Sequence, residues 1–141
     1  MEETSTLLKR AKEKYADGQL ESALSDLDKA IEIQPNCHEA LRLRGGLSFR
    51  VRNYSQAISD FYLLTNTFPD SLYCSHGLYH SYLCMERVPD ALAEASRFFE
   101  QPRSKEQLLD ETFCDYKKAY LEMAELYTVS PNDCLKWLHV E

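Results

Sequence analysis

The chain has 141 residues, a hydrophobic content of 44% and a formal net charge of −7. This length suffices for one compact domain or for about three to four repeated helix pairs. No stretch is dense in Lys and Arg, which argues against a nucleic-acid binder, and no apolar run approaches the roughly 20 residues that span a bilayer. The five cysteines are odd in number and follow an acidic amino terminus, so we expect free thiols in a cytoplasmic protein, with the nucleus as an alternative.

The first predicted helix pair covers residues 4–37. Asp17-Gly18 separates its two helices, and Pro35 ends the second because proline lacks an amide hydrogen and clashes with the preceding turn. The apolar positions of the first helix follow helical spacing: Leu7, Leu8, Ala11 and Tyr15. Those of the second helix do the same: Ala23, Leu24, Leu27, Ala30 and Ile31.

Two further pairs, over residues 38–71 and 72–102, repeat this pattern at a constant interval, which matches the length of about 34 residues that is typical of one class of helical repeat. The proline of the third pair falls one position short of this period, and Gly45 lies inside a helical pattern, where close packing is the expected reason. Asp and Glu are spread along the helices and are expected on solvated faces. The period is carried by these residues: Ala23, Ala57 and Ala91; Leu20, Tyr54 and Val88; Pro35 and Pro69.

The region 104–141 departs from the period. Ser104 and Gln107 have capping-box spacing, and the apolar residues after them predict one long amphipathic helix that ends near Tyr127. Ser130-Pro131 is a second helix start signal. The short terminal helix expected after it would carry Leu135, Trp137 and Leu138.

These residues resemble the tetratricopeptide repeat (TPR). The resemblance lies in Leu20-x-x-Ala23 with Pro35, in Tyr54-x-x-Ala57 with Pro69, and in Val88-x-x-Ala91, and it covers about residues 4–102. It implies an all-α, right-handed α-solenoid of three TPR-like helix pairs, with a C-terminal capping helix or partial fourth repeat, in a single domain spanning 1–141. The third pair departs from the pattern, since Tyr79 and Phe98 stand at positions that usually hold small residues. Phe98 is expected to fill the space that Ala95 leaves.

The resemblance also implies a concave groove that is lined by the first helix of each pair and binds a segment of another protein. Some members of the family bind acidic chaperone tails through Lys, Asn and Arg. The matching positions here are Leu8, Lys12, Leu43, Tyr73 and Gly77, which lack the required set, so cochaperone function is disfavoured. Mapped by register, the groove residues expected to bind the partner are Lys9, Lys12, Tyr15, Arg42, Phe49, Arg50, Tyr73, His76 and His80.

The expected function is that of a non-catalytic adaptor or scaffold, and the basic groove residues suggest an acidic or phosphorylated segment of the partner. A monomer is expected rather than a homodimer. The alternatives are a self-associating subunit or a fragment of a larger assembly, with Leu135, Trp137 and Leu138 as an exposed edge.

Enzymatic chemistry is not expected, because the sequence has no nucleophile elbow and no Gly-rich phosphate loop. His76, His80 and Cys84 share one helix face, but residues 77–79 lack the Glu of a zinc-protease helix. We therefore expect no metal site and no cofactor. The tail aromatics are expected in the core and cap: Tyr116, Tyr120, Tyr127 and Trp137.

Overall fold

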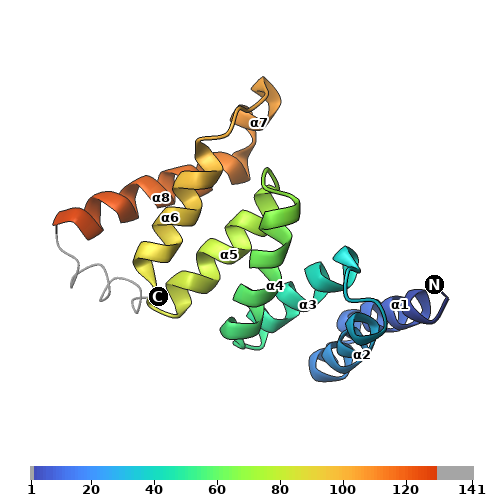
Figure 1. Cartoon of the computed structure of the whole chain (residues 1–141). Helices are drawn as coiled ribbons and strands as arrows, with labels where there is room; N and C mark the ends of the chain where they lie inside the picture. Colours follow the sequence, from blue (N-terminus) through green and yellow to red (C-terminus); the bar gives the residue numbers. More distant parts are fainter. Residues whose placement is uncertain (1, 130–141) are drawn as a thin grey trace. The chain divides into compact units, whose positions relative to one another are not determined.

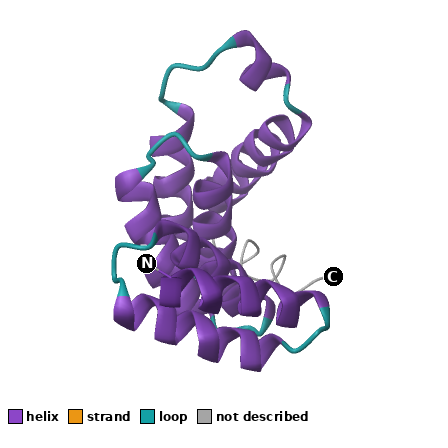
Figure 2. Cartoon of the chain, turned by 90° about the vertical axis from the view of Figure 1, so that its right-hand side faces the viewer, coloured by secondary structure: helices purple, strands orange, loops and turns teal. Residues whose placement is uncertain are grey.

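The computed structural model describes residues 2–129, which Figure 1 traces in chain order. Every regular element in this range is an α-helix, and short loops join the helices (Figure 2). The chain divides into two compact units, Met1–Thr67 and Phe68–Glu141. Within residues 2–129, no helix combines the length and the hydropathy that crossing a bilayer requires. The predicted all-α class is confirmed.

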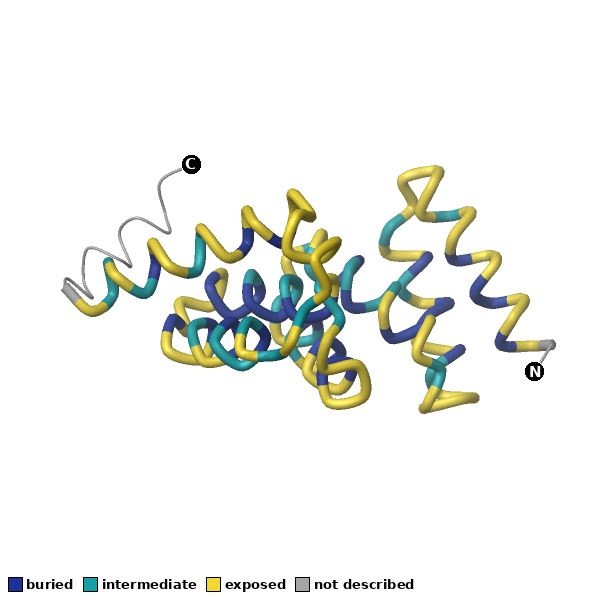
Figure 3. Tube along the Cα trace, turned by 90° about the horizontal axis from the view of Figure 1, so that it is seen from above, coloured by how far each residue is buried: buried dark blue, intermediate teal, exposed yellow. Residues whose placement is uncertain are grey.

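The first unit consists of two helix pairs. Helices α1 (Glu2–Ala16) and α2 (Leu20–Ile33) form one pair, and α3 (His38–Arg50) and α4 (Tyr54–Thr67) form the other. Helix α2 also packs on α3, and buried positions recur along each of these helices (Figure 3). The predicted apolar faces of the first pair supply most of the core cluster: Leu7, Leu8, Ala11, Ala23, Leu27 and Ala30. Ala40 and Leu47 on α3, which were not predicted, complete it.

The turn inside each pair contains one residue with a left-handed backbone. Gly18 has φ of 80°, Arg52 has φ of 65° and Glu86 has φ of 58°, and successive members of this set are separated by one sequence period. The residue after each of them closes the turn, as Gln19 N does by donating to the Lys14 carbonyl at 2.8 Å. Glycine adopts this conformation at little cost, whereas Arg52 and Glu86 adopt it only because the turn requires it. The period of the sequence is therefore also a period of the backbone.

Gly45 lies where α3 and α4 approach closely. A Cβ atom at this position would lie 3.2 Å from two ring carbons of Phe61 and 3.4 Å from Cβ of Asp60. This confirms close packing as the reason for a glycine within the helix.

Three acidic side chains on the second helices are buried, which corrects the expectation that all Asp and Glu are solvated. Asp26, Asp60 and Glu94 have relative exposures of 2%, 0% and 8%, and they too follow the period of the sequence. Arg10 donates to Asp26 at 2.7 and 3.3 Å, and Arg44 donates to Asp60 at 2.8 and 2.9 Å. A buried carboxylate is tolerated only with such partners, so each of these pairs ties its first helix to its second.

In the third pair, the buried carboxylate has a different kind of partner. Leu78 stands where the period would place arginine, and Glu94 instead accepts from Arg97 on its own helix, at 2.6 and 2.9 Å.

In the first pair, the hydrogen bonds from Arg10, together with the nearby Lys14 ammonium, hold the pKa of Asp26 below its ordinary value.

The second unit contains α5 (Leu72–Cys84), α6 (Val88–Phe99), α7 (Lys105–Leu109) and α8 (Glu111–Val129). Helix α5 pairs with α6, and α8 packs on α6 and α7. The Ser71 hydroxyl caps α5 by accepting from Cys74 N, and Pro89 lies in the first turn of α6, where its missing amide hydrogen costs nothing.

The predicted long helix after Ser104 is wrong, because Asp110 interrupts it. The capping box of Ser104 and Gln107 is present, as predicted, but α7 ends after five residues, where Asp110 has an extended backbone. The Asp110 carboxylate then accepts from Phe113 N at 2.9 Å and so begins α8. The second start signal at Ser130 and the short terminal helix lie outside the described residues.

The core of the second unit is aromatic. Tyr79, Phe98 and Tyr116 are each at most 1% exposed. The ring centroid of Phe98 lies 5.6 Å from that of Tyr116 and 5.9 Å from that of Phe113. The Tyr116 hydroxyl is hydrogen-bonded to the Ser75 hydroxyl at 2.9 Å. Phe98 therefore fills space between α6 and α8, which explains a large residue at a position that is usually small.

Candidate functional site

One set of predicted site residues lies on α1 and α3, in the first unit. Lys12 forms an ion pair with Glu39, and Arg50 donates a hydrogen bond to the Tyr15 hydroxyl. Both interactions join the two helices, so the first helices of consecutive pairs present one shared surface. We call this surface the α1/α3 face, and it consists of Lys9, Lys12, Tyr15, Glu39, Arg42, Phe49 and Arg50.

Arg50 is held in place from two directions. Its guanidinium carbon lies 5.3 Å from the centroid of the Tyr15 ring, within cation–π range, while one nitrogen donates to the hydroxyl of the same residue. The neighbouring Phe49 packs edge-on against Tyr54, with ring centroids 5.5 Å apart. Because guanidinium has five N–H donors, Arg50 keeps donors for a ligand after the bond to Tyr15.

The α1/α3 face has a positive balance of charge. Lys9 and Arg42 are exposed on α1 and α3, and with Lys12 and Arg50 they outnumber Glu39. Tyr15 adds an exposed aromatic ring, with 41% relative exposure. The arrangement suits carboxylate or phosphate groups next to an apolar side chain, although the protein as a whole is acidic.

The remaining predicted site residues lie on α5, in the second unit. Tyr73 is 44% exposed. His76 and His80 are half-buried and hydrogen-bonded to each other, with 2.8 Å between their Nε2 atoms. The ring centroid of His76 lies 4.9 Å from that of Tyr116 on α8, so this histidine packs against the aromatic core.

Both histidines are held in the neutral form. Burial lowers the pKa of His76 to about 4, and a proton on His80 would lower it further by repulsion; burial also lowers the pKa of His80. The mutual hydrogen bond needs one ring as donor and the other as acceptor, which a doubly protonated pair cannot provide. At neutral pH this part of α5 is therefore uncharged.

We predict a pH dependence of stability from His76. The unfolded chain binds a proton near pH 6.5, whereas the folded chain resists it until about pH 4. The unfolded state thus holds more protons between these values, and the free energy of unfolding should fall as the pH drops through this window. Urea unfolding at pH 7.5 and pH 5 measures it. His76→Gln should flatten the profile in this window. An equal profile for His76→Gln and wild type would contradict the prediction.

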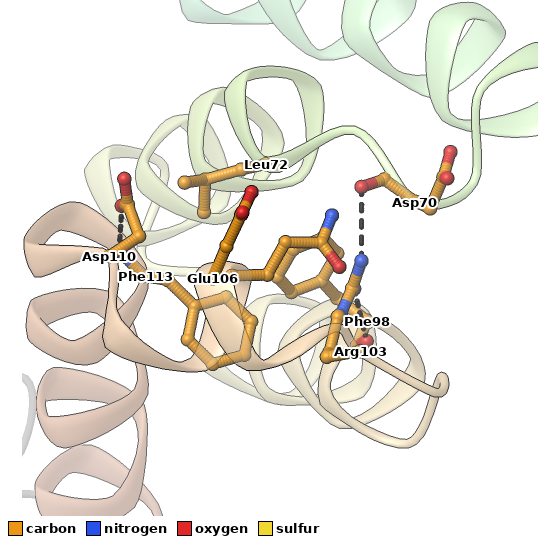
Figure 4. Close-up of a pocket in the computed structure, with 8 residues that line it drawn as sticks. Asp70, Leu72, Phe98, Arg103, Glu106, Asp110 and Phe113 are labelled. Atoms are coloured by element: carbon orange, nitrogen blue, oxygen red, sulfur yellow. Dashed lines mark hydrogen bonds between the residues drawn. The ribbon is translucent and has the colours of Figure 1, made fainter.

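The structure also contains a hollow that sequence reasoning missed, at the junction of α6, α7 and α8 (Figure 4). Its volume is about 280 Å³, and its apolar lining consists of Leu72, Phe98 and Phe113. Arg103 also lines it, with its guanidinium carbon 3.8 Å from the Phe98 ring centroid. In the sequence, the one signal that points to this hollow is Arg103, which directly precedes the Ser104 capping box.

Arg103 has a structural role in this hollow. It donates to the carbonyls of Asp70 and Phe98 at 3.1 and 2.7 Å (Figure 4). Arg97 and Gln101 donate to the Pro69 carbonyl at 2.9 and 2.8 Å. These side chains tie the turn before α5 to the end of α6 with donors from Arg97, Gln101 and Arg103, although the buried Nε of Arg103 has no hydrogen-bond partner among the described residues.

Among residues 2–129, no group of three or more His, Cys, Asp or Glu side chains is arranged to hold a metal ion. His76 and His80 bond each other, and Cys84 is exposed further along α5. Within the described range these cysteines form no disulfide bond: Cys37, Cys74, Cys84 and Cys114.

Helices packed in consecutive pairs, with Gly45 at the close approach of α3 and α4, define the class of the fold as that of TPR domains. A solved structure described as the first TPR of Spaghetti (RPAP3) bound to the HSP90 peptide SRMEEVD superposes with a TM-score of 0.72. The match covers 88% of this chain and 94% of that chain, at 12% sequence identity. It confirms the predicted TPR-type fold. No protein-family model and no curated protein sequence matches the chain.

Proposed function

We propose that the chain is a non-catalytic adaptor or scaffold module that binds a segment of another protein on its α1/α3 face. The observation that carries this proposal is the pairing of Lys12 with Glu39 and of Tyr15 with Arg50, which holds cations and an aromatic ring on one exposed surface. Side chains that are already oriented lose less conformational entropy when a ligand binds. The organisation we propose is a single repeat domain, with pairs over 4–37, 38–71 and 72–102 and a cap over 104–141.

The partner segment we propose is acidic or phosphorylated. A carboxylate or phosphate would accept from Arg50 and Arg42 and would compete with Glu39 for Lys12. An apolar side chain next to it would pack on Tyr15. On α5, the predicted groove residues Tyr73, His76 and His80 offer an uncharged surface of their own, which would suit an apolar segment.

The double charge reversal Arg42→Glu/Arg50→Glu should weaken partner binding at least tenfold, since each charge-assisted hydrogen bond contributes about 1.5–3 kcal/mol. Affinity capture with the full chain, quantified by mass spectrometry, identifies the partners and measures the loss. The matched control is Lys29→Glu/Arg52→Glu, which makes the same charge change at two exposed positions. Lys29 lies on α2, and Arg52 lies in the turn between α3 and α4. Undiminished capture by the Arg42/Arg50 variant would refute the proposal.

A chaperone tail is the alternative ligand, and the peptide SRMEEVD is bound by the structural neighbour. Against it, Leu8 is 8% exposed at a position where tail-binding members of the family place a polar ligand group, and Lys12 is occupied by Glu39. Calorimetric titration of this peptide distinguishes the two. We expect no binding at micromolar concentrations, and a signal that depends on Lys12 would favour cochaperone function.

A further inference from the structure

The outward side of α8 carries a second hollow, next to α7. It encloses about 480 Å³, and Leu108, Phe113 and Leu121 supply its apolar lining. Leu121 is 53% exposed and Leu108 is 47% exposed. Large apolar side chains gathered at an exposed hollow are typical of an interaction surface.

Charged residues flank Leu121 on this side of α8 with opposite signs. Lys117 and Lys118 precede it and Glu122 and Glu125 follow it, and all four line the same hollow and are exposed. With 3.6 residues per turn, positions 117, 121 and 125 lie along one line of the helix surface, with 118 and 122 beside it. We call these five residues, 117, 118, 121, 122 and 125, the α8 stripe.

The α8 stripe is complementary to itself. If a second copy of α8 packs antiparallel with its Leu121 opposite the first, positions 117 and 125 come level, because each is four residues from Leu121. The basic half of each helix then lies beside the acidic half of the other. A parallel arrangement would place like charges together, which is unfavourable. The charge order therefore favours one partner and one orientation.

We propose that the α8 stripe is a homodimer interface, in which α8 of two copies packs antiparallel about a two-fold axis at Leu121. Such an interface uses the same patch on both subunits, as two-fold dimers do. It goes beyond the proposed adaptor function, since a dimer carries two α1/α3 faces and can bind a partner with two segments more tightly than one face alone. In this proposal the chain is a dimer, whereas the sequence analysis expects a monomer.

Charge reversal tests the proposal on the full chain by sedimentation equilibrium. Wild type should rise from 16.4 kDa toward twice that mass with concentration. The range should extend to about 0.5 mM, because one helix pair buries less than the roughly 1,200–2,000 Å² of a stable complex. Lys117→Glu/Lys118→Glu and Glu122→Lys/Glu125→Lys should each remain monomeric. An equimolar mixture of the two variants, and the variant with all four changes, should regain the dimer mass.

The mixture and the fourfold variant separate loss of charge complementarity from damage to the fold, since the fourfold variant keeps the net charge and composition of wild type.

Disulfide cross-linking tests the position of the two-fold axis at Leu121. In a Cys84→Ser/Cys114→Ser chain, Leu121→Cys should form a covalent dimer on mild oxidation, whereas Leu63→Cys, equally exposed on α4 at 51%, should not. A wild type that stays at 16.4 kDa overturns the proposal. The proposal is also overturned if both charge-reversal variants still dimerise, even if that dimer is lost when residues 130–141 are deleted.

Discussion

Replacing Asp60 with alanine is expected to lower the free energy of unfolding by about 3–5 kcal/mol. The Asp60 carboxylate is fully buried and accepts two hydrogen bonds from Arg44 and one from Gln56, at 2.8, 2.9 and 3.0 Å. Its removal leaves the Arg44 guanidinium, whose side chain is only 16% exposed, without its main counter-charge. Chemical denaturation followed by circular dichroism measures the loss.

The same arginine supplies the control for this prediction. Asp28 also accepts from Arg44, at 3.0 Å, but its side chain is 63% exposed. Because water screens an exposed ion pair, Asp28→Ala should cost less than about 1 kcal/mol. Similar losses for the two aspartates would show that burial does not govern the strength of this contact.

A double variant tests the mechanism of the Asp60 effect. The third pair already has Leu78 at the position that Arg44 occupies in the second. Arg44→Leu combined with Asp60→Ala removes both charges, so it should recover part of the loss caused by Asp60→Ala alone. A double variant that is less stable than either single variant would contradict an unpaired buried charge as the cause.

Replacing Phe98 with alanine should destabilise the second unit by about 3–5 kcal/mol. The side chain is fully buried between α6 and α8, its ring lies 5.1 Å from that of Phe99 by centroid distance, and Arg103 covers its face. A methyl group cannot fill this space, and the cavity would also remove the support of Arg103. Phe98→Leu keeps more volume and should cost less.

The matched control is Leu109→Ala, also in the second unit, because Leu109 is 83% exposed and should change stability by less than about 0.5 kcal/mol. Hydrogen exchange should locate the effect of Phe98→Ala in α6 and α8 rather than in α1 and α2, since repeat folds unfold by neighbouring units. Equal stability of the Phe98 and Leu109 variants would show that the aromatic core is not what holds α8 in place.

Much of the fold was predictable from the sequence because the deciding signals are local. The spacing of Leu7, Ala11 and Tyr15 predicted a helix, and Gly18 predicted its end. The capping box at Ser104 was predictable for the same reason, since its two hydrogen bonds join residues three apart. Asp110 was not recognised as the break after α7, because an aspartate is compatible with both a helix interior and a cap.

The candidate site was only partly predictable. The period placed Lys12, Tyr15 and Arg50 on first helices, and the structure has them there. Their pairing across α1 and α3 spans 27 and 35 residues of sequence, which no local pattern encodes. His76 was expected on an open groove surface, and only the structure reveals that Tyr116, from the distant helix α8, packs against it.

The sequence by itself determined the repeat, the helices and their turns, because periodicity and capping act within a few residues. Only the tertiary structure decided which charges are buried and which are paired. Arg10 and Asp26 are 16 residues apart, as are Arg44 and Asp60, and their shared spacing became meaningful once each first helix lay against its second. The environment of a side chain depends on packing between distant segments. The same residue type is therefore exposed to solvent as Asp28 and buried in an ion pair as Asp60.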